Sequence, residues 1–361
     1  MKPDTFSELL KKLHTAAPNL AEPDAWPSEQ LSAMSDAGVL GWLVPPEFDG
    51  SDITPSELVA GYEKLAAACL TSVFVLTQRD AAIQRLVRSP NFELKESLLR
   101  ALVDDSLFAT VGISHLTTSR QHWKQPTVRV EDTDGGFVLN GDIPWVTGAD
   151  RADVIVTGGT LGDGRQLLVA LRMNSEGVVV QEPATLLALN ASRTASIQLK
   201  EVFVPESDLV AGPVEEVMKV AGGGAGSHTT SALAVGHSVA AVKLLRGEAE
   251  TRPELLEIVE PFETELAELQ AALRAATEFE GDKLPPRLSA ESLRQRSNSL
   301  ALRSTQASLA ASKGAGFVVG HPASRLVSEA MFFLVWSCPQ PVVLANLREL
   351  AAGGGASPTL E

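Results

Sequence analysis

Residues 135–159, GGFVLNGDIPWVTGADRADVIVTGG, contain the pattern that decides the fold. Two short apolar, β-branched stretches flank an Asn-Gly pair and a Pro-Trp-Val-Thr run. Such runs, separated by Gly, Asn and Asp, are typical of antiparallel strands. Alternate residues of a strand project to one face, so the spacing predicts that Trp145 and Thr147 lie side by side. They either pack into a core or form a wall for a flat ligand.

The same pattern continues over residues 108–212 in PTVRVED, RQLLVALR and SIQLKEVFVP. This region is expected to form a compact antiparallel β domain. Three pairs of residues are predicted to form tight turns or hairpin tips that require positive φ: Asp134-Gly135, Asn140-Gly141 and Asp163-Gly164.

Helical periodicity precedes and follows the β region. Residues 1–107 are predicted to form an N-terminal helical domain, with helix starts at Pro27-Ser28-Glu29 and Pro55-Ser56-Glu57. Residues 213–350 carry long periodic runs that predict a C-terminal four-helix bundle. Residues 351–361, AAGGGASPTLE, are expected to be a flexible tail. The fold class is therefore α+β and multidomain.

Composition excludes several classes of function. The 361 residues carry a formal net charge of −15, which argues against nucleic acid or an anionic membrane as the main partner. The apolar runs are too short to span a membrane. Cys69 and Cys338 form no CxxC motif, so we expect a reducing, cytoplasmic location. The six histidines show no metal-binding spacing, so no metal site is predicted.

Four segments together resemble the acyl-CoA dehydrogenase superfamily of flavoproteins. The first is AGVLGWLVPPEFDGSDITPSE, and the second is the stretch 135–159 quoted above. The third and fourth are ASRTASIQLKEVFVP and GAGFVVGHPASRLVSEAMFF, and all four follow the family's order and spacing. The resemblance covers nearly the whole chain. It implies the helix–β–helix architecture described above, a bound FAD, and a homodimer or homotetramer in which a neighbouring subunit completes the cofactor site.

The resemblance also implies roles for individual residues. Trp145 would pack against the isoalloxazine ring and Thr147 would hydrogen-bond near its N5. Ser114 corresponds to the threonine of the family's Thr-Glu-Pro turn near the flavin. Gly314 and Gly316 are what remains of a glycine-rich run that approaches the adenine half of FAD. The alternative for the first pair is an ordinary core Trp beside a strand Thr.

The family's catalytic glutamate is missing. Counting without gaps from Pro322, Ser337 occupies its position. Some relatives carry the glutamate on an earlier helix, where this chain has Thr230, followed by Ser231 in place of a common arginine. A serine hydroxyl with no adjacent histidine in the sequence cannot remove an α-proton near neutral pH. The catalytic residues are therefore unknown, with nearby histidines such as His237 as candidates.

The resemblance predicts an FAD-dependent oxidoreductase that acts on an acyl thioester or a related acyl substrate, with CoA as one possible carrier. Two alternatives stay open. One is a flavin-dependent monooxygenase of the same fold, which needs no α-proton base. The other is a degenerate, non-catalytic scaffold protein that keeps the fold for binding or assembly.

Overall fold

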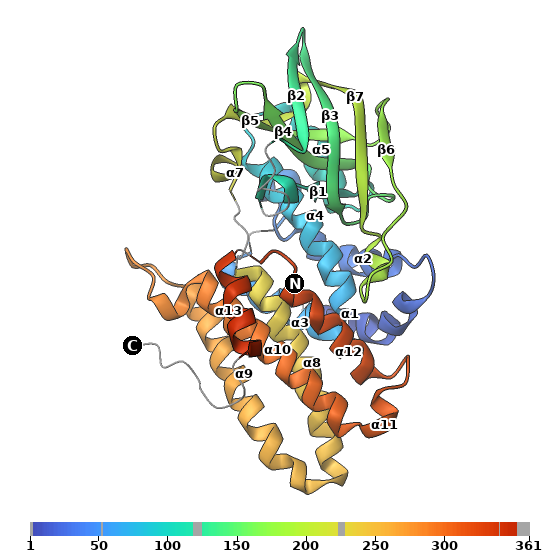
Figure 1. Ribbon diagram of the computed structural model, residues 1–361, viewed down its shortest axis with the longest axis vertical. Helices are drawn as coiled ribbons and strands as arrows, with labels where there is room; N and C mark the ends of the chain where they lie inside the picture. Colours follow the sequence, from blue (N-terminus) through green and yellow to red (C-terminus); the bar gives the residue numbers. More distant parts are fainter. Residues whose placement is uncertain (1–2, 52, 118–124, 223–227, 339, 352–361) are drawn as a thin grey trace. The chain divides into compact units, whose positions relative to one another are not determined.

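The computed structural model describes residues 3–51, 53–117, 125–222, 228–338 and 340–351. The described chain groups into two compact units (Figure 1). Unit 1 takes its residues from Met1–Thr54 and Thr71–Gly224, and unit 2 takes its residues from Pro55–Leu70 and Ala225–Glu361. The domain boundaries predicted at 107/108 and 212/213 stay predictions, and the tail beyond Ala351 lies outside the described residues.

Unit 1 combines helices with one sheet of eight strands. Its helices are α1 (Pro3–Ala16), α2 (Ser28–Asp36), α4 (Leu70–Arg88), α5 (Phe92–Val103), α6 (Ser114–Thr117) and α7 (Val217–Val220). Its strands are β1 (Ala109–Gly112), β2 (Val128–Thr133), β3 (Gly136–Val146), β4 (Val154–Leu161), β5 (Gln166–Arg172), β6 (Val178–Val180), β7 (Ala195–Pro205) and β8 (Leu209–Val214).

The strand order is β6-β7-β3-β2-β4-β5-β8, and β1 pairs with β4. Most neighbours are antiparallel, as the sequence predicts, but β4 pairs in parallel with both β1 and β2. Ala109 lies beside Val154 at the start of β4, and Arg129 lies beside Thr160 near its end. The sheet is therefore mostly antiparallel rather than wholly so.

The sheet is buried on both faces along β4. Val154 and Val156 belong to a core cluster that includes Leu86 of α4 and Leu98 of α5. Ile155 points to the opposite face, where it packs with residues of β3, β5 and β7. Because successive strand residues alternate between faces, this double burial explains the continuous apolar run that the sequence shows in β4.

Two of the three predicted turns are confirmed. Gly135 closes the β2–β3 hairpin with φ +76°, and Gly164 closes the β4–β5 hairpin with φ +92°. The turn predicted at Asn140-Gly141 is wrong, because both residues lie inside β3. Gly141 instead marks a register shift against β7, with φ +134° and no room for a side chain beside the Thr127 carbonyl.

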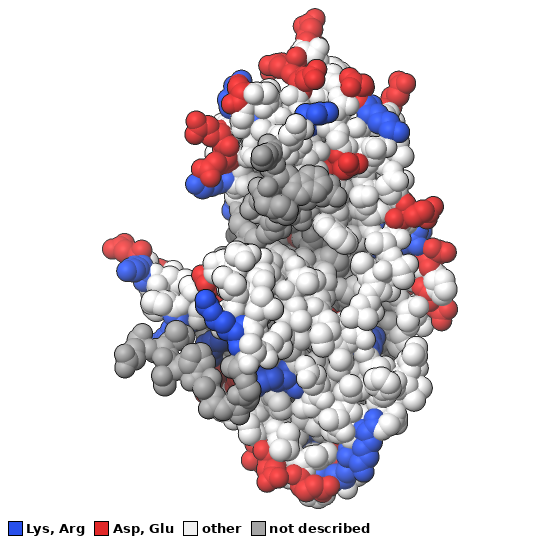
Figure 2. Space-filling model, viewed as in Figure 1, with Lys and Arg blue, Asp and Glu red and all other residues white. Residues whose placement is uncertain are grey.

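The β2–β3 hairpin ends in exposed acidic side chains, Glu131, Asp132 and Asp134. Figure 2 shows acidic residues in red at this end of unit 1. Charged residues at an exposed hairpin tip discourage pairing with a further strand.

Within the described part of the chain, no helix combines the length and the apolar character that a membrane span needs.

Unit 2 is helical, which confirms the predicted C-terminal helical region. Its helices are α3 (Pro55–Ala68), α8 (His228–Thr251), α9 (Leu256–Thr277), α10 (Ala290–Ala311), α11 (Lys313–Gly316), α12 (Pro322–Ala330) and α13 (Gln340–Ala351). The helix α3 comes from early in the sequence and starts at the predicted Pro55. It packs closely on α8, because a Cβ on Gly236 would lie 2.1 Å from the Glu63 carbonyl oxygen.

Helices α8 and α10 lie side by side and run parallel. The Ser308 hydroxyl donates to the Ala241 carbonyl at 2.7 Å, and the Ser312 hydroxyl donates to Glu248 Oε1 at 3.5 Å. From the first contact to the second, the residue number increases in both helices, so the helices run in the same direction. The two partners of each contact are 67 and 64 residues apart in the sequence. This register sets which polar side chains of the two helices meet.

Candidate functional site

Trp145 lies near the end of β3 and is 60% exposed. Its backbone has φ +57°, in the left-handed region that a bulky L-residue rarely adopts. The pairing of β3 with β7 shifts register between Ile143 and Val146, so Trp145 lies at this irregularity. A strained backbone that holds a large exposed ring is the kind of outlier that clusters at ligand sites.

The helix α6 is hydrogen-bonded to β3 at Pro144, the residue before Trp145. Ser114, the first residue of α6, donates its hydroxyl hydrogen to the Pro144 carbonyl at 3.0 Å. His115 Nε2 lies 2.9 Å from the Gly158 carbonyl of β4. Ser114 is therefore bonded to the backbone of the residue that precedes Trp145, and the roles of both residues at a flavin stay predictions.

Thr147 differs from the expected arrangement. The residue is 3% exposed and lies just after the end of β3, whereas Trp145 is largely exposed. The predicted alternation fails here because the left-handed backbone at Trp145 interrupts the extended strand. The two side chains thus do not form one open wall in this structure, and their roles at a flavin stay predictions.

The Thr147 hydroxyl belongs to a chain of three buried hydroxyls. Thr147 Oγ1 lies 3.3 Å from Thr194 Oγ1, which lies 2.8 Å from Ser192 Oγ. Either atom of each pair can donate. If Ser192 donates to Thr194 and Thr194 donates to Thr147, the Thr147 proton is free to donate to a further acceptor.

Arg193 holds the turn that carries these hydroxyls. Its guanidinium donates to Asp150 Oδ2 through Nε at 3.0 Å and Nη2 at 2.6 Å, and to Asp24 Oδ1 through Nη1 at 2.6 Å. The Gly148 amide also donates to the Ser192 carbonyl at 2.8 Å. Sequence reasoning missed Ser192, Arg193 and Thr194, although the polar Ser-Arg-Thr run shortly before β7 was the available signal.

The other predicted cofactor residues belong to unit 2. Gly314 and Gly316 lie in the short helix α11, next to the exposed Phe317. A side chain at Gly314 would meet open space, whereas a Cβ at Gly316 would lie 2.7 Å from the Ser312 Cβ. Packing therefore requires glycine at position 316 but not at 314. The contacts that either residue would make with FAD stay predictions.

Ser337 stands in a turn without an acidic residue. It follows the 3-10 helix Met331–Leu334 and has a left-handed backbone with φ +49°. The segment MFFLVWSC (331–338) contains no Asp or Glu. This turn therefore supplies no carboxylate base, as expected from the serine at the position of the family's catalytic glutamate.

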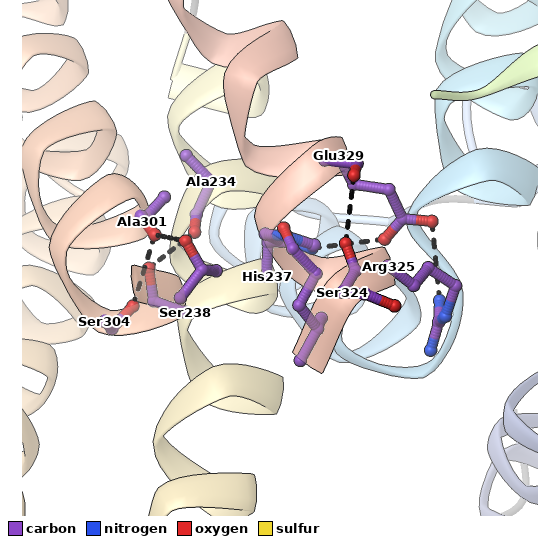
Figure 3. A network of polar contacts seen from close by, with 11 residues as sticks. Ala234, His237, Ser238, Ala301, Ser304, Ser324, Arg325 and Glu329 are labelled. Atoms are coloured by element: carbon purple, nitrogen blue, oxygen red, sulfur yellow. Dashed lines mark hydrogen bonds and ion pairs between the residues drawn. The ribbon is translucent and has the colours of Figure 1, made fainter. Parts of the chain in front are cut away.

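A buried polar cluster joins α8 and α12 in unit 2. Figure 3 shows His237 of α8 facing Glu329 of α12 and Arg325 reaching the same carboxylate. His237 Nε2 lies 2.8 Å from the Leu326 carbonyl, and Nδ1 lies 3.7 Å from Glu329 Oε2. Arg325 Nη1 lies 3.4 Å from Glu329 Oε1. Sequence reasoning missed Glu329 as a partner of His237, because the two residues are far apart along the chain.

Burial governs the protonation of His237. Burial lowers the pKa of His237 below its usual value, and the opposing effects of Glu329 and of the Leu326 carbonyl are smaller. His237 is fully enclosed, so this histidine anchors α8 to α12 rather than meeting a substrate. Among the described residues, no three His, Cys, Asp or Glu side chains come close enough to hold a metal ion.

Comparisons with known proteins agree with this fold. The family model for the N-terminal domain of acyl-CoA dehydrogenases matches residues 4–106. The probable acyl-CoA dehydrogenase YngJ of Bacillus subtilis is 23% identical over 266 residues, which cover 70% of this chain and 68% of that protein. The oxygenase subunit HsaA of a Rhodococcus jostii flavin-dependent monooxygenase is 23% identical over 199 residues, covering 55% of this chain and 48% of that protein.

Solved structures match over nearly the whole length. The glutaryl-CoA dehydrogenase of Mycobacterium smegmatis, in complex with FADH2, superposes with a TM-score of 0.81 at 15% identity, covering 98% of this chain and 95% of that chain. At this identity the match shows the fold. The N-terminal family match, the curated relatives and the fold agree with one another, and all three show similarity to the acyl-CoA dehydrogenase superfamily.

Proposed function

We propose that this protein is a flavin-dependent oxidoreductase that binds FAD and acts on an acyl thioester or a related acyl substrate. The observation that carries the proposal is the ring of Trp145, which unit 1 holds exposed on a left-handed backbone, directly after the Pro144 carbonyl that accepts from Ser114. A flat apolar surface suits an isoalloxazine ring, which is planar.

A bound flavin would supply hydride transfer to or from the substrate. The chain's own residues would bind and orient it. Trp145 would offer a stacking surface, and the buried chain of Ser192, Thr194 and Thr147 would direct a hydroxyl toward a ring edge. The relative solved with FADH2 supports flavin as the cofactor class.

The absence of Asp and Glu from the segment 331–338, which contains Ser337, favours a second candidate function. A flavin-dependent monooxygenase of the same fold needs no carboxylate to remove an α-proton, and one curated relative is the oxygenase subunit of such an enzyme. The homo-oligomeric state and the cytoplasmic location predicted from the sequence remain part of the proposal. A non-catalytic scaffold is the outcome that would replace both candidates.

One spectroscopic experiment separates these possibilities. The purified protein is mixed with FAD, passed through a desalting column and examined for visible flavin absorbance. Retained absorbance that is bleached by butyryl-CoA without oxygen supports the acyl-CoA dehydrogenase reaction. Retained flavin that consumes oxygen only after chemical reduction supports the monooxygenase. A colourless protein that retains neither FAD nor FMN overturns the proposal in favour of the scaffold.

A further inference from the structure

Arg294 is a fully buried cation that pairs with no Asp or Glu of the described chain. It lies on α10 and is 0% exposed. Its Nη2 donates to the Trp336 carbonyl at 2.9 Å, whereas Nε and Nη1 have no hydrogen-bond partner among the described residues. Since Nε carries one hydrogen and Nη1 two, three of its five N–H groups are unsatisfied.

Two aromatic rings and the Cys338 side chain lie around the Arg294 guanidinium. The guanidinium carbon lies 5.7 Å from the centre of the Phe333 ring and 5.4 Å from that of Trp336. Burial lowers the pKa of Arg294, and the nearby Cys338 side chain opposes this effect. No Asp or Glu of the described chain forms an ion pair with it. Removing such a cation from water without a carboxylate counter-ion is unfavourable, and an arginine does not readily lose its proton to avoid that cost.

Further unsatisfied polar atoms lie on the same face of α10. Ser297 and Asn298 follow Arg294 by three and four residues, the spacing of neighbours along a helix face. Both are fully buried, and neither Ser297 Oγ nor Asn298 Oδ1 has a partner among the described residues. Asn298 Nδ2 donates to the Phe333 carbonyl at 2.9 Å, which fixes the orientation of its amide.

The neighbouring helix contributes one more such atom. Ser231 of α8 is fully buried, and its hydroxyl likewise has no partner among the described residues. With the register fixed by the Ala241–Ser308 and Glu248–Ser312 contacts, Ser231 lies level with residues 295–298 of α10. Hydroxyl donors from two helices thus lie at the level of the unpaired guanidinium.

We propose that unit 2 contains a binding site for a carboxylate or a similar small oxyanion, built from Arg294, Ser297 and Ser231. An oxyanion only accepts hydrogen bonds, so it matches the N–H and O–H donors of these three residues and supplies the missing counter-charge. Asn298 Oδ1 is the one acceptor in the group, and a water that accompanies the anion satisfies it.

The anion has two possible sources with the same chemistry. It is either a free metabolite anion or a carboxylate at the far end of an acyl substrate. All of the proposed ligands belong to unit 2, and the inference does not depend on whether unit 1 binds flavin.

The test measures thermal unfolding of the full-length protein without added flavin. Sodium glutarate, acetate and phosphate are compared with sodium chloride at equal ionic strength, and glutaryl-CoA is compared with butyryl-CoA, which lacks the distal carboxylate. A ligand that binds only the folded state raises the Tm, by at least about 2 °C at a hundredfold excess over its Kd. A shift with the free oxyanions identifies a metabolite site, and a shift with glutaryl-CoA alone identifies a substrate carboxylate.

Two variants and a matched control sharpen the test. Arg294→Met removes the charge at similar volume and is expected to abolish the shift. Ser297→Ala removes a hydroxyl that has no partner, so it is expected to leave the Tm without ligand unchanged while weakening the apparent affinity several-fold. Arg303→Met, an exposed arginine of the same helix paired with Glu265, is expected to keep the full shift.

The proposal is overturned if no oxyanion stabilises the wild-type protein more than chloride and glutaryl-CoA acts no better than butyryl-CoA. It is also overturned if Arg294→Met retains the shift. Should Arg294→Met fail to fold, Ser297→Ala decides the matter, because an unchanged affinity in that variant contradicts the site.

Discussion

The hydroxyl of Ser114 lies 3.0 Å from the carbonyl oxygen of Pro144, and this bond joins the first turn of α6 to the residue before Trp145. The exposed indole therefore stands on a backbone that is fixed from two sides, by α6 and by the pairing of β3 with β7. A surface that is rigid before its ligand arrives loses less conformational freedom on binding.

Trp145→Ala is expected to weaken FAD binding at least about tenfold, because the stacking surface and its apolar area are lost together. Flavin titration followed by fluorescence measures this change. Phe203→Ala removes another exposed aromatic ring of unit 1 and serves as the control, with unchanged affinity. Equal affinities of wild type and Trp145→Ala would remove the indole from the flavin site.

Arg193→Gln is expected to lower the free energy of unfolding by about 1–2 kcal/mol, because the variant loses charge-assisted bonds to Asp150 and Asp24. Urea unfolding measures this loss. Arg165→Gln breaks an exposed pair with Asp163 and is expected to cost less than about 0.5 kcal/mol. If both variants lose the same stability, Arg193 does not hold the Ser192–Thr194 turn as described.

His237 makes stability depend on pH in a defined direction. Its pKa is lowered in the folded protein, so below about pH 6.5 the unfolded chain takes up a proton that the folded protein does not. The contribution of His237 to the free energy of unfolding is therefore complete above that pH. It decreases as the pH drops, by at most about 1.4 kcal/mol per pH unit for this one group.

His237→Gln is expected to flatten this dependence between pH 7.5 and about 5.5, measured as the slope of the urea unfolding free energy against pH. The remaining slope includes His228, whose pKa burial also lowers. Ser238→Ala provides the control, because it changes a buried residue of the same helix without removing a titratable group. An unaltered slope in His237→Gln would show that this side chain takes up its proton as readily in the folded protein as in the unfolded chain.

Ser337→Ala is expected to change any acyl-CoA turnover by less than about twofold, because a lone hydroxyl contributes no general base near neutral pH. Steady-state kinetics with the substrate found by the spectroscopic experiment checks this. A hundredfold fall in kcat with an unchanged Tm would instead assign the Ser337 hydroxyl a direct part in the reaction.

Local sequence signals predicted the elements well where one residue type determines the backbone. The start of α3 at Pro55 and the hairpin tip at Gly164 follow from fixed or positive φ. The Asn140-Gly141 pair has the same local signal, but it forms an irregularity within β3. Only the long-range pairing with β7 distinguishes these outcomes, and a local pattern does not contain it.

The site was less predictable because burial and backbone strain arise from the tertiary structure. The spacing of Trp145 and Thr147 suggested one shared face, but the left-handed φ of Trp145 separates an exposed ring from a buried hydroxyl. In the sequence, Arg294 is one of three arginines between residues 294 and 303. Its isolation becomes visible only when the packed rings of Phe333 and Trp336 are in place.

The early position of α3 in the sequence constrains how the protein folds during synthesis. During synthesis α3 leaves the ribosome long before α8, so Leu58, Tyr62 and Leu65, which are buried in the finished protein, have to wait for their packing partner. A nascent chain that ends at residue 224 carries a complete unit 1 together with one unpaired apolar helix. Any pair of complementing fragments must therefore leave residues 55–70 able to reach the C-terminal half.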